Sequence, residues 1–223
     1  IGQPVNDDER RAIAFLRNHL PDGYTLIHNF ELAQHDEVFE VDLAVLAPHA
    51  VYLVDIKGTH GVIDVHGAKW YPSGRPPFAS PLPKLRAHAK TLKGILTDSQ
   101  PGRMDVGQIY VDAVVVLTAR NAQLIDPSGR DSSDVVRLAD AHALFQNVAR
   151  VPARFSRTIT PLYNIVRAAI EGKARPRSGP LIFGNWRVLQ RLGATDHYTE
   201  YRAENLFAGA AAGGRRSGAT GPC

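Results

Sequence analysis

The chain lacks the cysteines that a disulfide-stabilised protein needs. Its one cysteine, Cys223, is the last of 223 residues, so no disulfide framework can form within it and a reducing compartment fits. It also lacks an apolar run of the roughly 18 residues that a membrane-spanning helix requires, and its first residues lack the apolar segment of a signal peptide. We therefore expect a cytoplasmic protein without a membrane partner.

Neither sign of charge is scarce. Lys and Arg number 26 and Asp and Glu number 22, which gives a net charge of +4 and a pI of about 9.3. This balance allows a polyanionic partner without requiring one. The hydrophobic content of 44% is that of a soluble globular protein, and the length suffices for one ordinary domain with an appendage.

Two short apolar runs, 39–46 and 50–56, are the most informative part of the sequence. The first is rich in β-branched and apolar residues, the second is again a short apolar run, Pro48 and His49 separate them, and Gly58 follows the second. Runs of this length and composition predict two adjacent β-strands with a tight connection.

Four charged residues interrupt these apolar strands. Because side chains alternate along a strand, Glu40 and Asp42 share one face of the first strand, and Asp55 and Lys57 share one face of the second. Carboxylates on neighbouring buried strands repel each other unless a positive charge lies between them, and a divalent cation with oxygen ligands would supply it. The alternative is an edge-strand salt bridge between Asp55 and Lys57.

The order Asp42, then Asp55-Ile56-Lys57, resembles the motif of the PD-(D/E)xK nucleases. With Glu9-Arg10-Arg11 on an opening helix, Glu40-Val41-Asp42, and the stretch 51–58, the chain resembles the nuclease-related domain called NERD. This resemblance implies an α/β fold, a restriction-endonuclease-like mixed β-sheet flanked by helices.

The resemblance also implies catalytic roles. Asp42 and Asp55, with the carbonyl group of Ile56, would hold Mg²⁺ or Mn²⁺ against the scissile phosphate. Lys57 would orient or deprotonate the attacking water and offset the charge of the transition state. Asp42, Asp55 and Lys57 are therefore the predicted catalytic residues.

Two further carboxylates are candidate metal ligands by the same resemblance. Glu9 lies on the opening helix; the alternative is a solvent-facing residue that favours the helix dipole. Glu40 precedes Asp42 by two residues; strand geometry also permits it to face outward.

Four cations are candidates for contact with nucleic acid. Lys69 lies in a predicted hairpin, and Lys84, Arg86 and Lys90 lie on a helix predicted over 84–96. An ordinary solvated surface explains them equally well. Lys84 stands where NERD domains commonly have a glutamine, which is a departure from the family pattern and bears on water positioning.

The rest of the chain alternates strands and helices, as an α/β domain requires. We expect helices over 8–19, 140–150 and 161–171, strands over 24–30, 109–118 and 135–138, a polar turn over 31–37 and a hairpin over 62–71. The nuclease-like domain would cover 1–172, and the basic, proline-containing stretch 173–180 would be a linker.

Past this linker, 181–207 resembles the start of a protein kinase. Gly193 corresponds to the first glycine of the glycine-rich loop and Tyr201-Arg202-Ala203 to the following strand, but Thr195 and Tyr198 replace the other glycines. No catalytic kinase motif follows, so we expect neither functional ATP binding nor kinase activity. The tail 208–223 is of low complexity, and we expect it to be disordered.

A NERD domain joined to a kinase start resembles the NERD-kinase proteins of bacterial phage-defence systems of the phage-growth-limitation (BREX) kind. The resemblance implies a Mg²⁺-dependent endo- or exodeoxyribonuclease in anti-phage defence, with DNA and other defence proteins as partners. The alternative is a catalytically weak or inactive module that senses nucleic acid and regulates an attached serine/threonine kinase. The sequence leaves the oligomeric state and the choice between DNA and RNA open.

Overall fold

The computed structural model describes residues 1–34, 37–177, 182–183, 186–194 and 199–205. Contacts divide the chain into two units, Ile1–Arg177 and Ser178–Cys223, and each is described by itself. Within the described residues, no helix is both long and apolar enough to cross a membrane.

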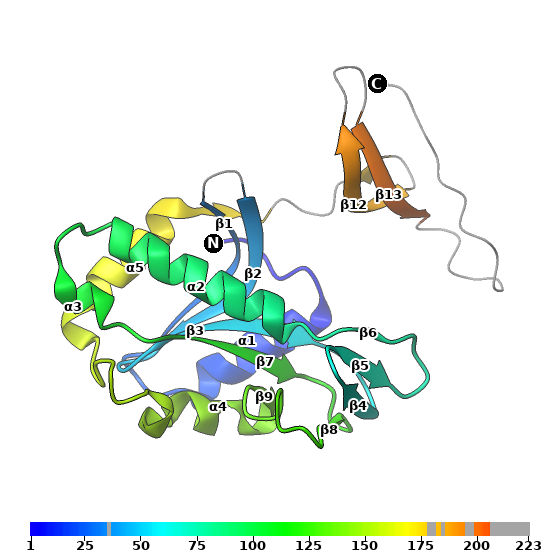
Figure 1. The fold of residues 1–223 in the computed structure, drawn as a ribbon, viewed down its shortest axis with the longest axis horizontal. Coiled ribbons are helices and arrows are strands. Elements are labelled where there is room, and N and C mark those ends of the chain that lie inside the picture. Colours follow the sequence, from blue (N-terminus) through cyan, green and yellow to red (C-terminus); the bar gives the residue numbers. More distant parts are fainter. Residues whose placement is uncertain (35–36, 178–181, 184–185, 195–198, 206–223) are drawn as a thin grey trace. The chain divides into compact units, whose positions relative to one another are not determined.

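A six-stranded mixed sheet forms the centre of the first unit (Figure 1). Neighbouring strands are antiparallel from β10 to β3 and parallel from β3 through β7 to β9. The predicted α/β class with a mixed sheet is thereby confirmed. The strands, in spatial order, are β10 (Ala174–Pro176), β1 (Thr25–Gln34), β2 (Glu37–Leu46), β3 (Val51–Lys57), β7 (Val111–Leu117) and β9 (Val135–Arg137).

Helices cover both faces of this sheet. On β3, Leu53 points into the core beneath α2 (Leu82–Asp98) and α5 (Tyr163–Lys173). The next residue, Val54, points into a second core beneath α1 (Asp7–His19) and α4 (Leu138–Gln146), because side chains alternate along a strand. β3 is thus buried from both sides, as its nearly continuous apolar sequence requires.

A smaller sheet of four strands follows β3. The predicted hairpin is confirmed as β4 and β5, and β4 pairs in parallel with β8. Trp70 is fully buried in this sheet, and its Nε1 donates to Asp131 Oδ2 at 2.7 Å. The strands, in spatial order, are β6 (Phe78–Ala79), β5 (Lys69–Pro72), β4 (Val62–His66) and β8 (Gln123–Ile125).

Short elements complete the described part. The first unit also contains α3 (Met104–Gly107) and the 3₁₀ turns η1 (Val148–Arg150) and η2 (Thr160–Leu162). In the second unit β11 (Ile182–Phe183), β12 (Trp186–Ala194) and β13 (Thr199–Asn205) form an antiparallel sheet. Thr195, Tyr198 and the tail 208–223, which the sequence analysis singled out, lie outside the described residues.

Four expectations about local structure need correction. β1 continues to Gln34 and β2 begins at Glu37, so most of the expected polar turn belongs to the strand ladder. The second helix begins two residues before Lys84, because Pro83 fits the first turn, where its missing N–H costs nothing.

The helix expected over 140–150 ends at Gln146, and a 3₁₀ turn follows it. The expected linker contains β10, whose residues pair with Phe30, Glu31 and Leu32 of β1. Its Pro176 is compatible with an edge strand, where one face of the backbone needs no ladder partner. The first unit therefore ends with a strand that returns to the main sheet.

Candidate active site

The site begins where β2 and β3 separate. Their ladder pairs Leu46 with Val51 and continues to the pair Leu43 and Val54, one residue short of Asp42 and Asp55. There the Ile56 N–H donates to Asp42 Oδ2 at 2.9 Å. The Asp42 carboxylate thus takes the place of a backbone carbonyl group as the partner of the Ile56 N–H, and it lies directly against β3.

Asp55 and Lys57 form the other half of the site. Lys57 Nζ donates to Asp55 Oδ1 at 3.0 Å and lies 2.9 Å from Asp55 Oδ2. The Oδ2 atom is buried and accepts no hydrogen bond of good geometry. One carboxylate oxygen therefore has a cation beside it but remains able to accept a further ligand.

The surroundings of Asp42 disfavour its ionised form. Burial and the negative charge of Asp55 raise the pKa of Asp42 to about 6, although the Ile56 N–H and the charges of Lys57 and Arg177 act in the opposite direction. The cations present thus compensate only part of the cost of burying Asp42. A site of this kind favours the binding of additional positive charge.

Arg177 bridges three of the predicted metal ligands. Its Nη1 donates to Asp42 Oδ1 at 3.0 Å and to Glu9 Oε1 at 3.5 Å, and its Nη2 donates to Glu40 Oε2. The Arg177 N–H donates to the Asn29 carbonyl at 3.3 Å, which anchors the residue after β10. Sequence reasoning placed Arg177 in a linker and missed this contact, because 135 positions separate it from Asp42.

Glu9 and Glu40 differ in how firmly they are held. Glu9 is 3% exposed and also accepts from the Val5 N–H and Asn6 Nδ2, each at 2.8 Å, and from Asn29 Nδ2. It does not face solvent, and both of its oxygens are used. Glu40 is exposed, and Arg177 is its one ion-pair partner within the described residues.

Asp8 is a nearby carboxylate that the sequence did not single out. Its Oδ1 accepts from Thr118 Oγ1 at 2.6 Å, a hydrogen bond that lowers its pKa. The Thr118 N–H in turn donates to the Lys57 carbonyl at 3.0 Å. A Cβ on Gly58 would lie 1.9 Å from Asp8 Oδ2, so the glycine permits α1 to approach the end of β3.

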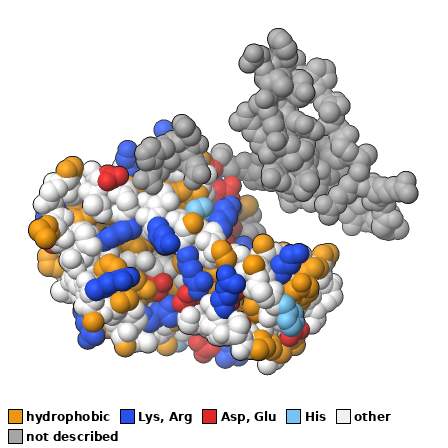
Figure 2. Space-filling view, viewed as in Figure 1, with side chains coloured by type: hydrophobic (Ala, Val, Ile, Leu, Met, Phe, Trp, Pro, Cys, Tyr) orange, Lys and Arg blue, Asp and Glu red, His pale blue; other side chains and the backbone are white. Residues whose placement is uncertain are grey.

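The predicted nucleic-acid contacts lie around the second helix and the hairpin. Figure 2 shows Lys and Arg side chains over α2. Lys69, Lys84 and Lys90 are exposed and form no ion pair within the described residues. Arg86, by contrast, donates to Asp134 Oδ2 at 2.6 Å and to the Arg130 carbonyl at 3.2 Å. It would have to exchange these partners to meet a phosphate.

The donor atoms are of the type that a divalent cation takes, but they do not form a closed cage. Within the described residues, no group of three or more His, Cys, Asp or Glu side chains could hold a metal ion. The chain does offer the available Oδ2 of Asp55 and the raised pKa of Asp42, on strands that separate at this point. Two carboxylates and a backbone carbonyl group are hard oxygen ligands, which suit Mg²⁺ with water completing its shell.

Comparison with known proteins gives two matches. A family model described as the nuclease-related domain, NERD, matches residues 5–118. A curated protein of Streptomyces coelicolor, described as "Probable kinase PglW", is 36% identical over 103 residues, which cover 43% of this chain and 6% of that protein. No solved structure matches the chain.

Proposed function

Because the chain belongs to the nuclease-related domain (NERD) family, we propose that its first unit hydrolyses phosphodiester bonds of DNA with the help of a divalent metal ion. The observation that carries this proposal is the pair of carboxylates, Asp42 and Asp55, at the point where β2 and β3 separate, with Lys57 beside them. We include in the proposal a restriction-endonuclease-like arrangement of the main sheet.

In this proposal Asp42, Asp55 and the Ile56 carbonyl would hold Mg²⁺ or Mn²⁺, which would supply Lewis-acid chemistry at the phosphate. Lys57, whose Nζ lies 2.9 Å from Asp55 Oδ2, orients the attacking water and offsets the negative charge that develops in the transition state. Attack is in line with the leaving oxygen.

Glu9 and Glu40 act through Arg177 in this proposal. Both carboxylates contact its guanidinium group, which also contacts Asp42. The firmly held Glu9 keeps Arg177 in place, so Arg177 limits the repulsion between the carboxylates. We assign Glu9 and Glu40 positioning roles.

We extend the proposal to biological role on the similarity to the Streptomyces coelicolor protein. Because the chain spans a small part of that relative's length, the activity and partners of the longer protein are proposals for this chain. On this basis the domain acts on foreign DNA in the cytoplasm, in bacterial anti-phage defence, next to a kinase-like segment.

A second function, sensing nucleic acid without cutting it, is supported by one specific contact. Arg177 already places a positive charge on Asp42 Oδ1 at 3.0 Å, which reduces the need for a metal ion there. Lys84, in place of the usual glutamine, also favours binding over catalysis. In this case the unit would regulate an attached kinase.

The test is cleavage of labelled linear, circular and single-stranded DNA with Mg²⁺ or Mn²⁺. We expect products from the unmodified chain and none in EDTA or from Lys57→Ala. An Asp22→Asn variant, at an exposed loop position, is the matched control and should cut normally. Retention of DNA without cleavage by folded protein would favour the sensing function instead.

A further inference from the structure

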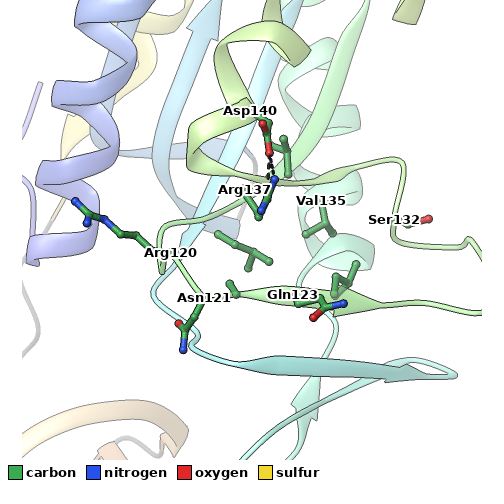
Figure 3. Close-up of a pocket in the computed structure, with 11 residues that line it drawn as sticks. Arg120, Asn121, Gln123, Ser132, Val135, Arg137 and Asp140 are labelled. Atoms are coloured by element: carbon green, nitrogen blue, oxygen red, sulfur yellow. Dashed lines mark hydrogen bonds and ion pairs between the residues drawn. The ribbon is translucent and has the colours of Figure 1, made fainter.

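A pocket of about 590 Å³ opens where β7 and β9 end (Figure 3). Apart from Leu117, its lining residues lie beyond residues 5–118, the part that the family model matches, and the proposed catalytic residues do not line it. Its polar lining consists of Arg120, Asn121, Gln123, Ser132, Arg137 and Asp140.

Strand register relates this pocket to the catalytic lysine. Lys57 pairs with Leu117 of β7, and Leu117 pairs in turn with Arg137 of β9. Residues paired in this way point to the same face of the sheet. Since neighbouring strands are about 4.8 Å apart, the backbone of Arg137 lies roughly 10 Å from the backbone of Lys57. A duplex rises about 3.4 Å along its axis per nucleotide of one strand, and successive phosphates are farther apart than this rise, so the pocket lies within about three nucleotides of Lys57.

Both arginines of the pocket can accept an anion. Arg120 is exposed and has no ion-pair or hydrogen-bond partner within the described residues, and in Figure 3 its side chain extends away from Arg137. Arg137 contacts Asp140 at 2.8 Å, but the two side chains are 59% and 55% exposed. Exposed pairs of this kind contribute little, so a phosphate can replace Asp140. Guanidinium groups bind phosphate oxygens with two parallel hydrogen bonds.

We propose that this pocket binds a backbone phosphate of the nucleic-acid strand, within about three nucleotides of the bond at Lys57. Arg120 supplies the main contact when its exposed side chain turns toward the pocket, and Arg137 adds to it when it leaves Asp140. Arg120 and Arg137 are binding residues that set how long a strand must be to bind well. This inference rests on the proposed function, because the place of Lys57 defines where the strand enters.

The test measures binding of a fluorescent oligonucleotide in EDTA, so that cleavage plays no part. Arg120→Ala should weaken binding about fivefold and lower the salt dependence by roughly 0.7 for a single strand. The matched control is Arg157→Ala. Arg157 is exposed, and its neighbours Ser156 and Ile159 bond to residues that precede β7 and β3, at the opposite end of these strands.

Two further arms complete the test. Asp140→Asn releases Arg137 and should strengthen binding, an outcome that misfolding cannot produce. Strands too short to reach from Lys57 to the pocket should bind equally to the unmodified chain and to Arg120→Ala.

Equal affinity and salt dependence for Arg120→Ala and Arg157→Ala would overturn the subsite, as would inorganic phosphate competing as strongly as the oligonucleotide. Metal-dependent cleavage could still be present in that case. Conversely, weaker binding by Arg120→Ala without any cleavage by the unmodified chain would support the phosphate subsite and contradict the proposed nuclease activity.

Discussion

Two clusters of partly buried charge lie on the same sheet and differ in how their carboxylates are paired. In the first, Arg150 Nη2 donates to Asp112 at 2.8 Å and to Asp134 at 2.9 Å, while Arg86 donates to the other Asp134 oxygen at 2.6 Å. Burial raises the pKa of Asp134, but the hydrogen bonds from Arg86 and Arg150 outweigh it, and the pKa is lowered. This cluster stabilises its own ionised form.

In the candidate site, by contrast, the ionised form of the buried carboxylate Asp42 is disfavoured. Asp42 keeps a pKa raised to about 6, and Asp55 Oδ2 has no hydrogen bond of good geometry. Each cluster contains two cations, but these face four carboxylates in the candidate site, where Arg177 also contacts Glu9 and Glu40, and two in the other cluster. The difference is that the site leaves a destabilising interaction in the folded state, which is typical of functional positions.

The largest expected effect is on cleavage. Asp55→Asn removes a negative charge and a proposed metal ligand while preserving the shape of the side chain. We expect the cleavage rate to fall by at least roughly 100-fold, with the thermal midpoint unchanged or raised. The Asp112→Asn variant, with its change in the paired cluster, should cleave DNA at the rate of the unmodified chain at temperatures below its thermal midpoint of unfolding. Equal cleavage by both variants would make the site structural.

The next effect is on stability. Here the larger loss is expected from a substitution in the paired cluster and the smaller loss from one in the candidate site. Arg150→Met leaves Asp112 and Asp134 without their shared partner and should lower the free energy of unfolding by roughly 3 kcal/mol. Arg177→Met should cost less, because Asp42 can take up a proton instead. Urea denaturation at neutral pH measures both. A larger loss from Arg177→Met would contradict the comparison.

The third prediction concerns pH. Between about 3.8 and about 6 the folded Asp42 carboxyl keeps a proton that the unfolded chain releases, so the contribution of Asp42 to stability falls as pH rises through this window. Asp42→Asn removes this dependence. We expect it to stabilise the protein by about 1–3 kcal/mol above pH 6 relative to its effect at pH 4. Denaturation across this range in EDTA is the measurement, and parallel pH profiles for the two proteins would refute it.

The smallest effect is on metal binding. Arg177→Ala removes the cation on Asp42 Oδ1, so Mn²⁺ should bind up to about fivefold more tightly, measured by titration calorimetry without DNA. Arg167→Ala, which breaks a surface pair with Glu171, is the matched control. Weaker binding in Arg177→Ala would show that Arg177 organises the site instead of competing for it.

Local sequence predicted most elements but not all of their ends. The strands around Asp42 and Asp55 follow from short β-branched runs, and α1 follows from its N-cap Asn6 and apolar spacing. The short strand β10 was missed because a proline-containing basic stretch reads as a linker. Its pairing with β1 depends on where α5 ends in space, which local patterns do not encode.

The sequence by itself determined the mixed α/β class and the approach of Asp42, Asp55 and Lys57 to one another, because these residues lie on two strands joined by a short turn. Only the tertiary structure brought Arg177 to Asp42 and placed Arg137 in register with Lys57 through Leu117. The physical reason is the difference in sequence separation between the interacting residues. Strand alternation and turn chemistry act over a few residues, whereas the partner that compensates a buried charge is chosen by packing of the whole sheet, across 135 positions of sequence.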